Sequence, residues 1–195
     1  MIIAKTLIVP PVAYKPVIYL YPETPTEVSV TLALNGRLTC TYPDYEDGWK
    51  GFTAHPDGTL TFPNSKEYYC LYWEGMQATE WDFSQGFCVK GEDTAAFLEW
   101  ALAEQGLTAR EANEFIIYWL PLMQENSYNV ISFQTEAYTS TAVLEVTPAP
   151  DSTIRIMMAY YPSDDAVEIT PQAFETPVRE GFTVVEWGGS RVEKP

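Results

Sequence analysis

Two glutamates stand beside tryptophans in mirrored order, in the segments WEG (residues 73–75) and EWG (residues 186–188). Both segments fall where a predicted strand ends, and functional residues concentrate where a rigid scaffold gives way to a loop. Two carboxylates held about 5–10 Å apart can act as acid and base, or as nucleophile and acid, on a glycosidic bond. A neighbouring indole would stack on a sugar ring and raise the pKa of a carboxyl group by excluding water. Glu74 and Glu186 are therefore candidate catalytic residues of a glycan hydrolase.

A second hypothesis, which we favour over an enzyme, is a non-catalytic binding module with an aromatic cleft. Flat rings provide contact area at a small entropic cost, so such a cleft would suit a glycan or an extended peptide. The candidate ligand-binding residues are Trp73, Trp81, Trp187, Tyr72, Asp82 and Arg155.

A third hypothesis is a purely structural domain, because large aromatic side chains are common in protein cores. In that case the tryptophans are core anchors, and both glutamates accept hydrogen bonds from the backbone or from an arginine. Arg155 is the candidate cation for an ion pair with one of these acids.

Other chemistries find little support in the residues present. His55 is the only histidine and precedes a turn, which disfavours a nucleophilic triad and excludes a multi-histidine zinc site. Asp44, Glu46 and Asp47 form a weak candidate calcium site, but their spacing differs from that of an EF-hand loop, and an ordinary acidic turn explains them as well. The chain has neither a phosphate-binding P-loop nor a G-x-G-x-x-G segment, so we expect no cofactor.

Charge restricts the classes of partner. The chain has 195 residues and a formal net charge of −16, with 11 basic against 27 acidic side chains. A nucleic acid or an anionic membrane requires a basic surface, so we expect neither as a partner. Cys40, Cys70 and Cys88 are widely spaced, which permits one disulfide but suits free thiols equally. We predict a cytoplasmic protein as written, because no signal peptide and no apolar run of about 20 residues is visible, and we leave export open.

The segment at residues 67–75, EYYCLYWEG, has bulky side chains on both alternating faces. A strand covered on both faces shows this pattern, so we predict a central strand between a β-sheet and helices. Alternation also predicts strands at residues 17–21, 28–34, 38–42, 49–55 and 59–62. Asn35-Gly36 and Asp57-Gly58 predict tight hairpin turns between them.

Two helices should follow, because after Gly91 the apolar residues recur at the three- and four-residue spacing of a helix. The first should begin near Asp93 or Thr94 and reach Gln105. The second should begin with a capping box formed by Thr108 and Glu111, and Pro121 should kink or end it.

Further strands are expected at residues 128–133, 142–146, 154–160 and 182–187, with a long surface loop at residues 162–181. The last strand is so apolar that it should insert beside an earlier one. We therefore predict a single α+β domain over residues 1–195, with an antiparallel, sandwich-like first half. It is mainly β at 15–90, has two helices at 93–125 and is mainly β again at 127–189.

Several separated segments resemble, in order, those of an uncharacterised protein family of bacteria and fungi. They are KPVIYLYP (15–22), AHPDGTL (54–60), YWEG (72–75), YWLP (118–121), VTPAPD (146–151) and GFTVVEWGG (181–189). The resemblance implies one conserved unit over nearly the whole chain. It supplies no activity and no catalytic residues.

Overall fold

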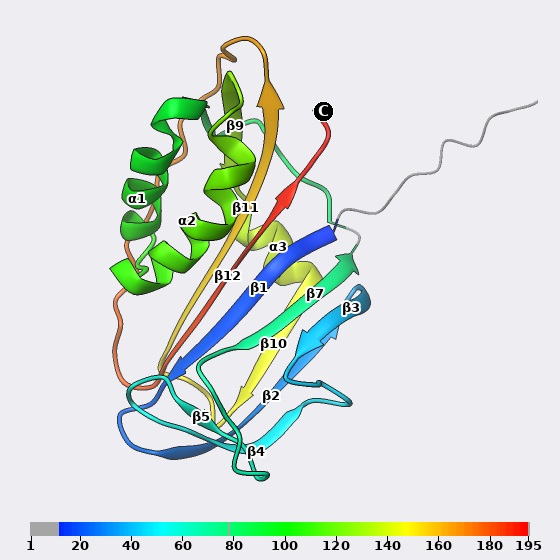
Figure 1. The fold of residues 1–195 in the computed structure, drawn as a ribbon, viewed down its shortest axis with the longest axis vertical. Coiled ribbons are helices and arrows are strands. Elements are labelled where there is room, and N and C mark those ends of the chain that lie inside the picture. The colour runs from blue at the N-terminus through cyan, green and yellow to red at the C-terminus, as the bar shows by residue number, and fades with distance from the viewer. Residues whose placement is uncertain (1–11, 78, 195) are drawn as a thin grey trace, which may run out of the picture.

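The computed structural model describes residues 12–77 and 79–194, which form two β-sheets and three α-helices (Figure 1). The seven-stranded sheet has, in spatial order, the strands β3 (Gly36–Tyr42), β7 (Leu71–Gln77), β1 (Val12–Tyr21), β12 (Thr183–Arg191), β11 (Ser152–Ser163), β9 (Tyr128–Phe133) and β8 (Phe87–Lys90). The five-stranded sheet has the order β10 (Ala142–Thr147), β2 (Thr26–Leu34), β4 (Trp49–Ala54), β5 (Leu60–Thr61) and β6 (Glu67–Tyr68). All pairings between the described strands are antiparallel except that of β11 with β12. The predicted α+β class is confirmed.

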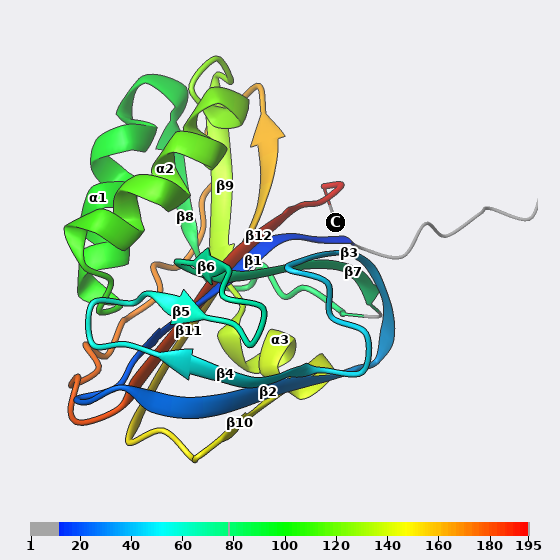
Figure 2. The ribbon, with the colours of Figure 1, turned by 60° about the horizontal axis from the view of Figure 1, so that its bottom comes forward.

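The seven-stranded sheet is the middle of three layers (Figure 2). The helices α1 (Thr94–Glu104) and α2 (Ala109–Met123) cover one face, and the five-stranded sheet covers the other. The short helix α3 (Thr135–Thr141) packs on the same side as the five-stranded sheet, through the buried Tyr138. None of the helices in the described part of the chain is long and apolar enough to span a lipid bilayer.

Side-chain alternation along β1 and β12 divides the core into two clusters. Val17, Tyr19 and Trp187 belong to the cluster under the helices, whereas Ile18 and Val184 belong to the cluster between the sheets. Because both faces are covered, every residue of β12 except Arg191 is buried. The last strand is inserted between β1 and β11, as its apolar sequence predicted.

The helices begin as predicted. The hydroxyl of Thr108 accepts a hydrogen bond from the backbone N–H of Glu111 at 3.4 Å, and the Glu111 carboxylate accepts one from the N–H of Thr108 at 2.7 Å. Pro121 does not end α2, which continues through it to Met123. Pro121 lies in the last turn and is exposed to solvent, so the missing N–H costs the helix little there.

The predicted hairpin at Asp57-Gly58 is confirmed by the antiparallel pairing of β4 with β5. The Asn35-Gly36 hairpin prediction was wrong, since β2 pairs in the five-stranded sheet and β3 pairs with β7 in the seven-stranded sheet. The residue pair marks a crossing between layers, which local turn chemistry does not distinguish from a hairpin. The helix α3 and the strand β8 were not predicted.

The prediction of one central strand at residues 67–75 was also wrong. Its beginning forms β6 in the five-stranded sheet, Tyr69 is exposed, and β7 begins only at Leu71. Tyrosine combines an apolar ring with a polar hydroxyl, so a run of tyrosines satisfies the pattern of a buried strand while lining a surface. The strand β12 is covered on both faces over nearly its whole length.

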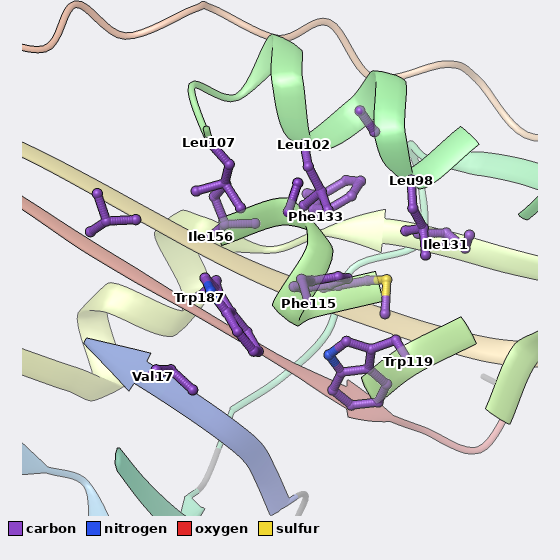
Figure 3. Close-up of a cluster of buried hydrophobic side chains, with 14 of the residues drawn as sticks. Val17, Leu98, Leu102, Leu107, Phe115, Trp119, Ile131, Phe133, Ile156 and Trp187 are labelled. Carbon is purple, nitrogen blue, oxygen red and sulfur yellow. The ribbon is translucent and has the colours of Figure 1, made fainter. Parts of the chain in front are cut away.

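The close contact between α2 and β12 depends on a residue without a side chain. A Cβ atom at Gly189 would overlap the indole ring of Trp119. Figure 3 shows Phe115 and Trp119 of α2 in the cluster under the helices, where the ring of Phe115 contacts both Trp119 and Trp187.

We expect Gly189→Ala to lower the free energy of unfolding by about 1–3 kcal/mol, because overpacking forces the indole or the helix to move. Urea denaturation measures the change. The matched control is Gly188→Ala, whose Cβ would meet Pro16 at a less severe 3.2 Å and should cost less. An equal loss in both variants would contradict this account of the helix–sheet contact.

Candidate functional site

Glu186 is completely buried between the two sheets. One carboxylate oxygen accepts a hydrogen bond from Nε1 of Trp73 at 3.0 Å, and the other accepts one from Nε of Arg155 at 2.6 Å. Arg155 also donates to the carbonyl of Ala142 at 2.8 Å, and its guanidinium group lies 4.8 Å from the ring centroid of Tyr138. The expected ion pair between Arg155 and one of the acids is therefore present, and it is a core contact.

Glu74 lies on the opposite face of the same sheet. Along β7, Leu71 and Trp73 point toward the five-stranded sheet, whereas Tyr72 and Glu74 alternate to the helical side. The structure therefore does not bring the two glutamates together as a pair, because their carboxylates lie on opposite faces of one sheet. Glu186 is also closed to substrate by its burial.

The three tryptophans that were expected to form a cleft do not meet. Trp73 is fully buried between the sheets and Trp187 is fully buried under the helices. Trp81 is partly buried against the cluster between the sheets. Neither Trp73 nor Trp187 offers a ring face to a ligand.

The remaining candidates are separate. Asp82 is exposed, and hydrogen bonds from the backbone and hydroxyl of Ser84, both 2.8 Å, lower the pKa of its carboxyl group. Asp44, Glu46 and Asp47 are exposed, and Asp47 pairs with Lys50 at 2.6 Å. In the described residues, no group of three or more histidine, cysteine or acidic side chains is arranged to hold a metal ion. All three cysteines are free thiols.

The structure brings a different set of aromatic residues together, in what we call the tyrosine cleft. It consists of two adjoining cavities of about 380 Å³ each, which share Tyr69. One cavity is lined by Tyr19, Tyr21, Asp57, Gly58, Tyr69, Thr108, Arg110, Glu111 and Arg179. The other is lined by Lys15, Val17, Tyr42, Glu67, Tyr68, Tyr69, Cys70, Tyr72 and Glu114.

Four parts of the fold form the walls of the tyrosine cleft. These are β1, the first half of α2 with its cap, the stretch from β6 to the start of β7, and the tip of the β4–β5 hairpin; Tyr42 at the end of β3 and Arg179 complete the lining. Tyr42 is 63% exposed and Tyr69 is 55% exposed, so both present much of their rings to solvent. Of the residues proposed from the sequence, only Tyr72 lines this cleft.

The two helix acids in the tyrosine cleft already have partners. The hydroxyl of Tyr19 donates to Glu114 at 2.7 Å. The same oxygen of Glu111 that completes the capping box also accepts a hydrogen bond from Arg179 at 2.6 Å. Arg179 lies 5.9 Å from the ring centroid of Tyr21. The acids thus hold α2 against β1 and the segment near residue 179.

Lys15 reaches the tyrosine cleft because β1 is irregular there. Its φ is +54°, in the left-handed region that non-glycine residues rarely occupy, and the pairing of β1 shifts register around it on both sides. Bulges of this kind redirect a side chain and occur often beside functional sites. The Lys15 ammonium group lies 4.6 Å from the ring centroid of Tyr118 and contributes a positive charge to the wall.

Cys70 is a weak nucleophile in this setting. Burial, followed by the charge of Glu114, raises the pKa of its thiol to about 12. The thiolate is the reactive form of cysteine, so this thiol stays unreactive near neutral pH.

The burial of the Arg155–Glu186 ion pair leads us to predict how the loss of either partner changes the free energy of unfolding. Arg155→Met should lower the free energy of unfolding by about 3–5 kcal/mol, because it leaves the carboxylate of Glu186 buried without its cation. Glu186→Met combined with Arg155→Met should cost less than the single change, since no unpaired charge remains. Urea denaturation of both variants measures the difference.

The control for that experiment is Lys50→Met. It breaks the ion pair between Lys50 and Asp47. The side chain of Lys50 is 51% exposed and that of Asp47 is 82% exposed, so the free energy of unfolding should hardly change. A double variant at least as unstable as Arg155→Met would contradict the charge-burial argument.

The raised pKa values of two buried tyrosines predict how stability depends on alkaline pH. Burial is the largest cause that raises the pKa of Tyr19 and of Tyr21, and the neighbouring Glu114 and Glu111 raise them further. A group whose pKa is higher in the folded state stabilises the fold fully below its unfolded pKa, and this contribution is lost as pH rises toward the folded pKa. We expect the free energy of unfolding to decrease above about pH 9 to 10, because Cys70 and these tyrosines begin to ionise in the unfolded chain.

Guanidinium denaturation between pH 7 and pH 11 tests this dependence. The double variant Tyr19→Phe, Tyr21→Phe should lose stability less steeply with pH than the parent protein. Tyr42→Phe serves as the control for removal of an exposed hydroxyl. Equal pH dependence in the parent and the double variant would refute the assignment.

Comparison with known proteins adds little to the geometry. No family model and no solved structure matches the chain. The chain is similar to the "Uncharacterized protein in bglA 3'region" of Butyrivibrio fibrisolvens, with 48% identity over 63 residues. The match covers 31% of this chain and 65% of that protein, so the chain spans slightly less than two thirds of the relative's length. The description of that relative assigns no activity, which agrees with the resemblance to a family of uncharacterised proteins and leaves the function of this chain unknown.

Proposed function

We propose that this protein is a non-catalytic binding module that holds a carbohydrate chain in the tyrosine cleft. The observation that carries the proposal is the convergence of six tyrosines from distant parts of the sequence on two adjoining cavities. Sugar rings present flat C–H faces, and tyrosine rings offer matching apolar area while their hydroxyls remain able to hydrogen-bond.

The polar groups of the tyrosine cleft fit an uncharged ligand rich in hydroxyl groups. Its charged lining residues are of both signs, three basic and four acidic: Lys15, Arg110, Arg179, Asp57, Glu67, Glu111 and Glu114. A hydroxyl group can donate to a carboxylate and accept from a cation, so a glycan satisfies both kinds of group at once. A ligand with a strong charge of one sign would meet repulsion from part of the wall.

The hydrogen bonds that Glu111 and Glu114 already accept favour binding over hydrolysis. Glu111 is occupied by the helix cap and by Arg179, and Glu114 accepts the hydroxyl of Tyr19. A glycosidase needs two carboxyl groups facing the scissile bond, one of them as a proton donor. Acids that already hold the fold together are poor candidates for that role.

The test is a glycan array followed by calorimetric titration with the best oligosaccharide. Tyr69→Ala and Tyr42→Ala should each weaken binding about tenfold or more, because each removes an exposed ring from the cleft wall, a loss on the scale of an interface hot spot. The far-UV spectrum and melting temperature of both variants should match those of the parent.

Ile117→Ala is the matched control, since Ile117 is an exposed apolar residue of α2 that does not line the cleft. It should bind like the parent. Three outcomes would overturn the proposal: no glycan binds, the tyrosine variants bind as well as the parent, or the oligosaccharide is cleaved during incubation.

A further inference from the structure

The strand β11 has a free edge over half of its length. It spans 12 residues and pairs with β12 from Ser152 to Tyr160. On the other side β9 pairs only with Met158–Ser163, and then the chain leaves the sheet to form α3 (Figure 1). Residues 152–157 therefore have a strand neighbour on one side only.

Two hydrogen bonds show which backbone groups face this open side. The carbonyl of Arg155 accepts from the hydroxyl of Thr135 at 3.2 Å, and that of Met157 accepts from the N–H of Gln134 at 2.7 Å. In a strand the N–H and C=O of one residue point to the same side, and the side changes with each residue. The N–H and C=O of Thr153 and the N–H of Arg155 thus face outward, where no described strand pairs with them.

A cavity lies beside this edge. It has a volume of about 330 Å³ and is bounded by residues 153–156 of β11 and by residues 172–175 of the crossing segment. It adjoins a second cavity of about 480 Å³, and the two share Phe133, Thr135 and Gln172. The second cavity is lined by residues of α3 and by none of β11, so the space beside the edge continues toward α3.

The crossing segment protects β9 but leaves β11 open. The side-chain amide of Gln172 accepts from the N–H of Phe133 at 2.8 Å and donates to its C=O at 2.9 Å. These are the two hydrogen bonds that a neighbouring strand would make with one residue. No equivalent substitute among the described residues serves Thr153.

The exposed charges along the two cavities are all negative. Their ionisable lining residues are Asp82, Glu136, Glu175 and Arg155. Arg155 is committed to Glu186, so the exposed ionisable groups are three carboxylates. A basic ligand is favoured here, whereas a second copy of this acidic chain would place like charges opposite one another.

The geometry points to a second binding site, for an extended basic peptide that adds a strand to the free edge of β11. Strand addition draws affinity from main-chain hydrogen bonds and draws specificity from alternate side chains of the peptide. Natural sheets cover or charge their free edges, and an edge bordered by a cavity and carboxylates is suited to pairing with a partner. This site is separate from the tyrosine cleft and does not depend on the carbohydrate proposal.

The test uses a fluorescent seven-residue peptide that alternates lysine with valine or threonine, and its binding is followed by anisotropy. Thr153→Pro should weaken binding at least tenfold, because it removes an outward N–H from the edge. Thr153→Val is the matched control, since it keeps the backbone N–H, and it should bind like the parent. A peptide with glutamate in place of lysine should bind at least tenfold more weakly.

Hydrogen exchange of the parent protein gives a readout that does not rely on the folding of a variant. Peptide binding should slow exchange at the amides of Thr153 and Arg155, and a saturating oligosaccharide should leave peptide affinity unchanged. Unchanged exchange at both amides, equal binding by Thr153→Pro and Thr153→Val, or self-association of the chain through this edge would overturn the proposal.

Discussion

The structure depends on the burial of one strand, β12, on both of its faces. Every second side chain of a strand points to the same face, so Trp187 must enter the core beneath the helices and Glu186 must enter the core between the sheets. A buried carboxylate is costly unless it is paired and hydrogen-bonded. Arg155 stands directly beside Glu186 in the parallel register of β11 and β12, and Trp73 donates the remaining hydrogen bond.

This requirement links three segments that are far apart in the sequence. Trp73 comes from β7, Arg155 from β11 and Glu186 from β12, while Tyr138 of α3 stacks its ring against the guanidinium group. Burial, the largest cause, and the charge of Glu186 raise the pKa of Tyr138, so its hydroxyl stays neutral. The residues that looked most like an active site in the sequence thus fix the packing of the two sheets.

The two proposed binding surfaces lie at places where a strand or face of the seven-stranded sheet lacks a close neighbour. On the helical side, α2 contacts β1 through Glu114 and Tyr19, and the tyrosines of β1 and of the β6–β7 connection line the cleft beside this contact. At the other edge, β9 leaves β11 to begin α3, and half of β11 is left without a neighbour.

The sequence by itself determined most elements and the α+β class. The capping box at Thr108, the Asp57-Gly58 turn and the apolar final strand are local signals, because a hydrogen bond, a backbone angle or a run of side chains defines each of them. Tertiary structure alone decided that Asn35-Gly36 joins two sheets and that Glu74 and Glu186 lie on opposite faces. Alternation tells which residues share a face, but it does not tell which strands become neighbours or which layer covers a face. For that reason the tyrosines of the cleft, drawn from β1, β3 and the stretch from β6 to β7, could be recognised as a group only once long-range pairing had placed them together.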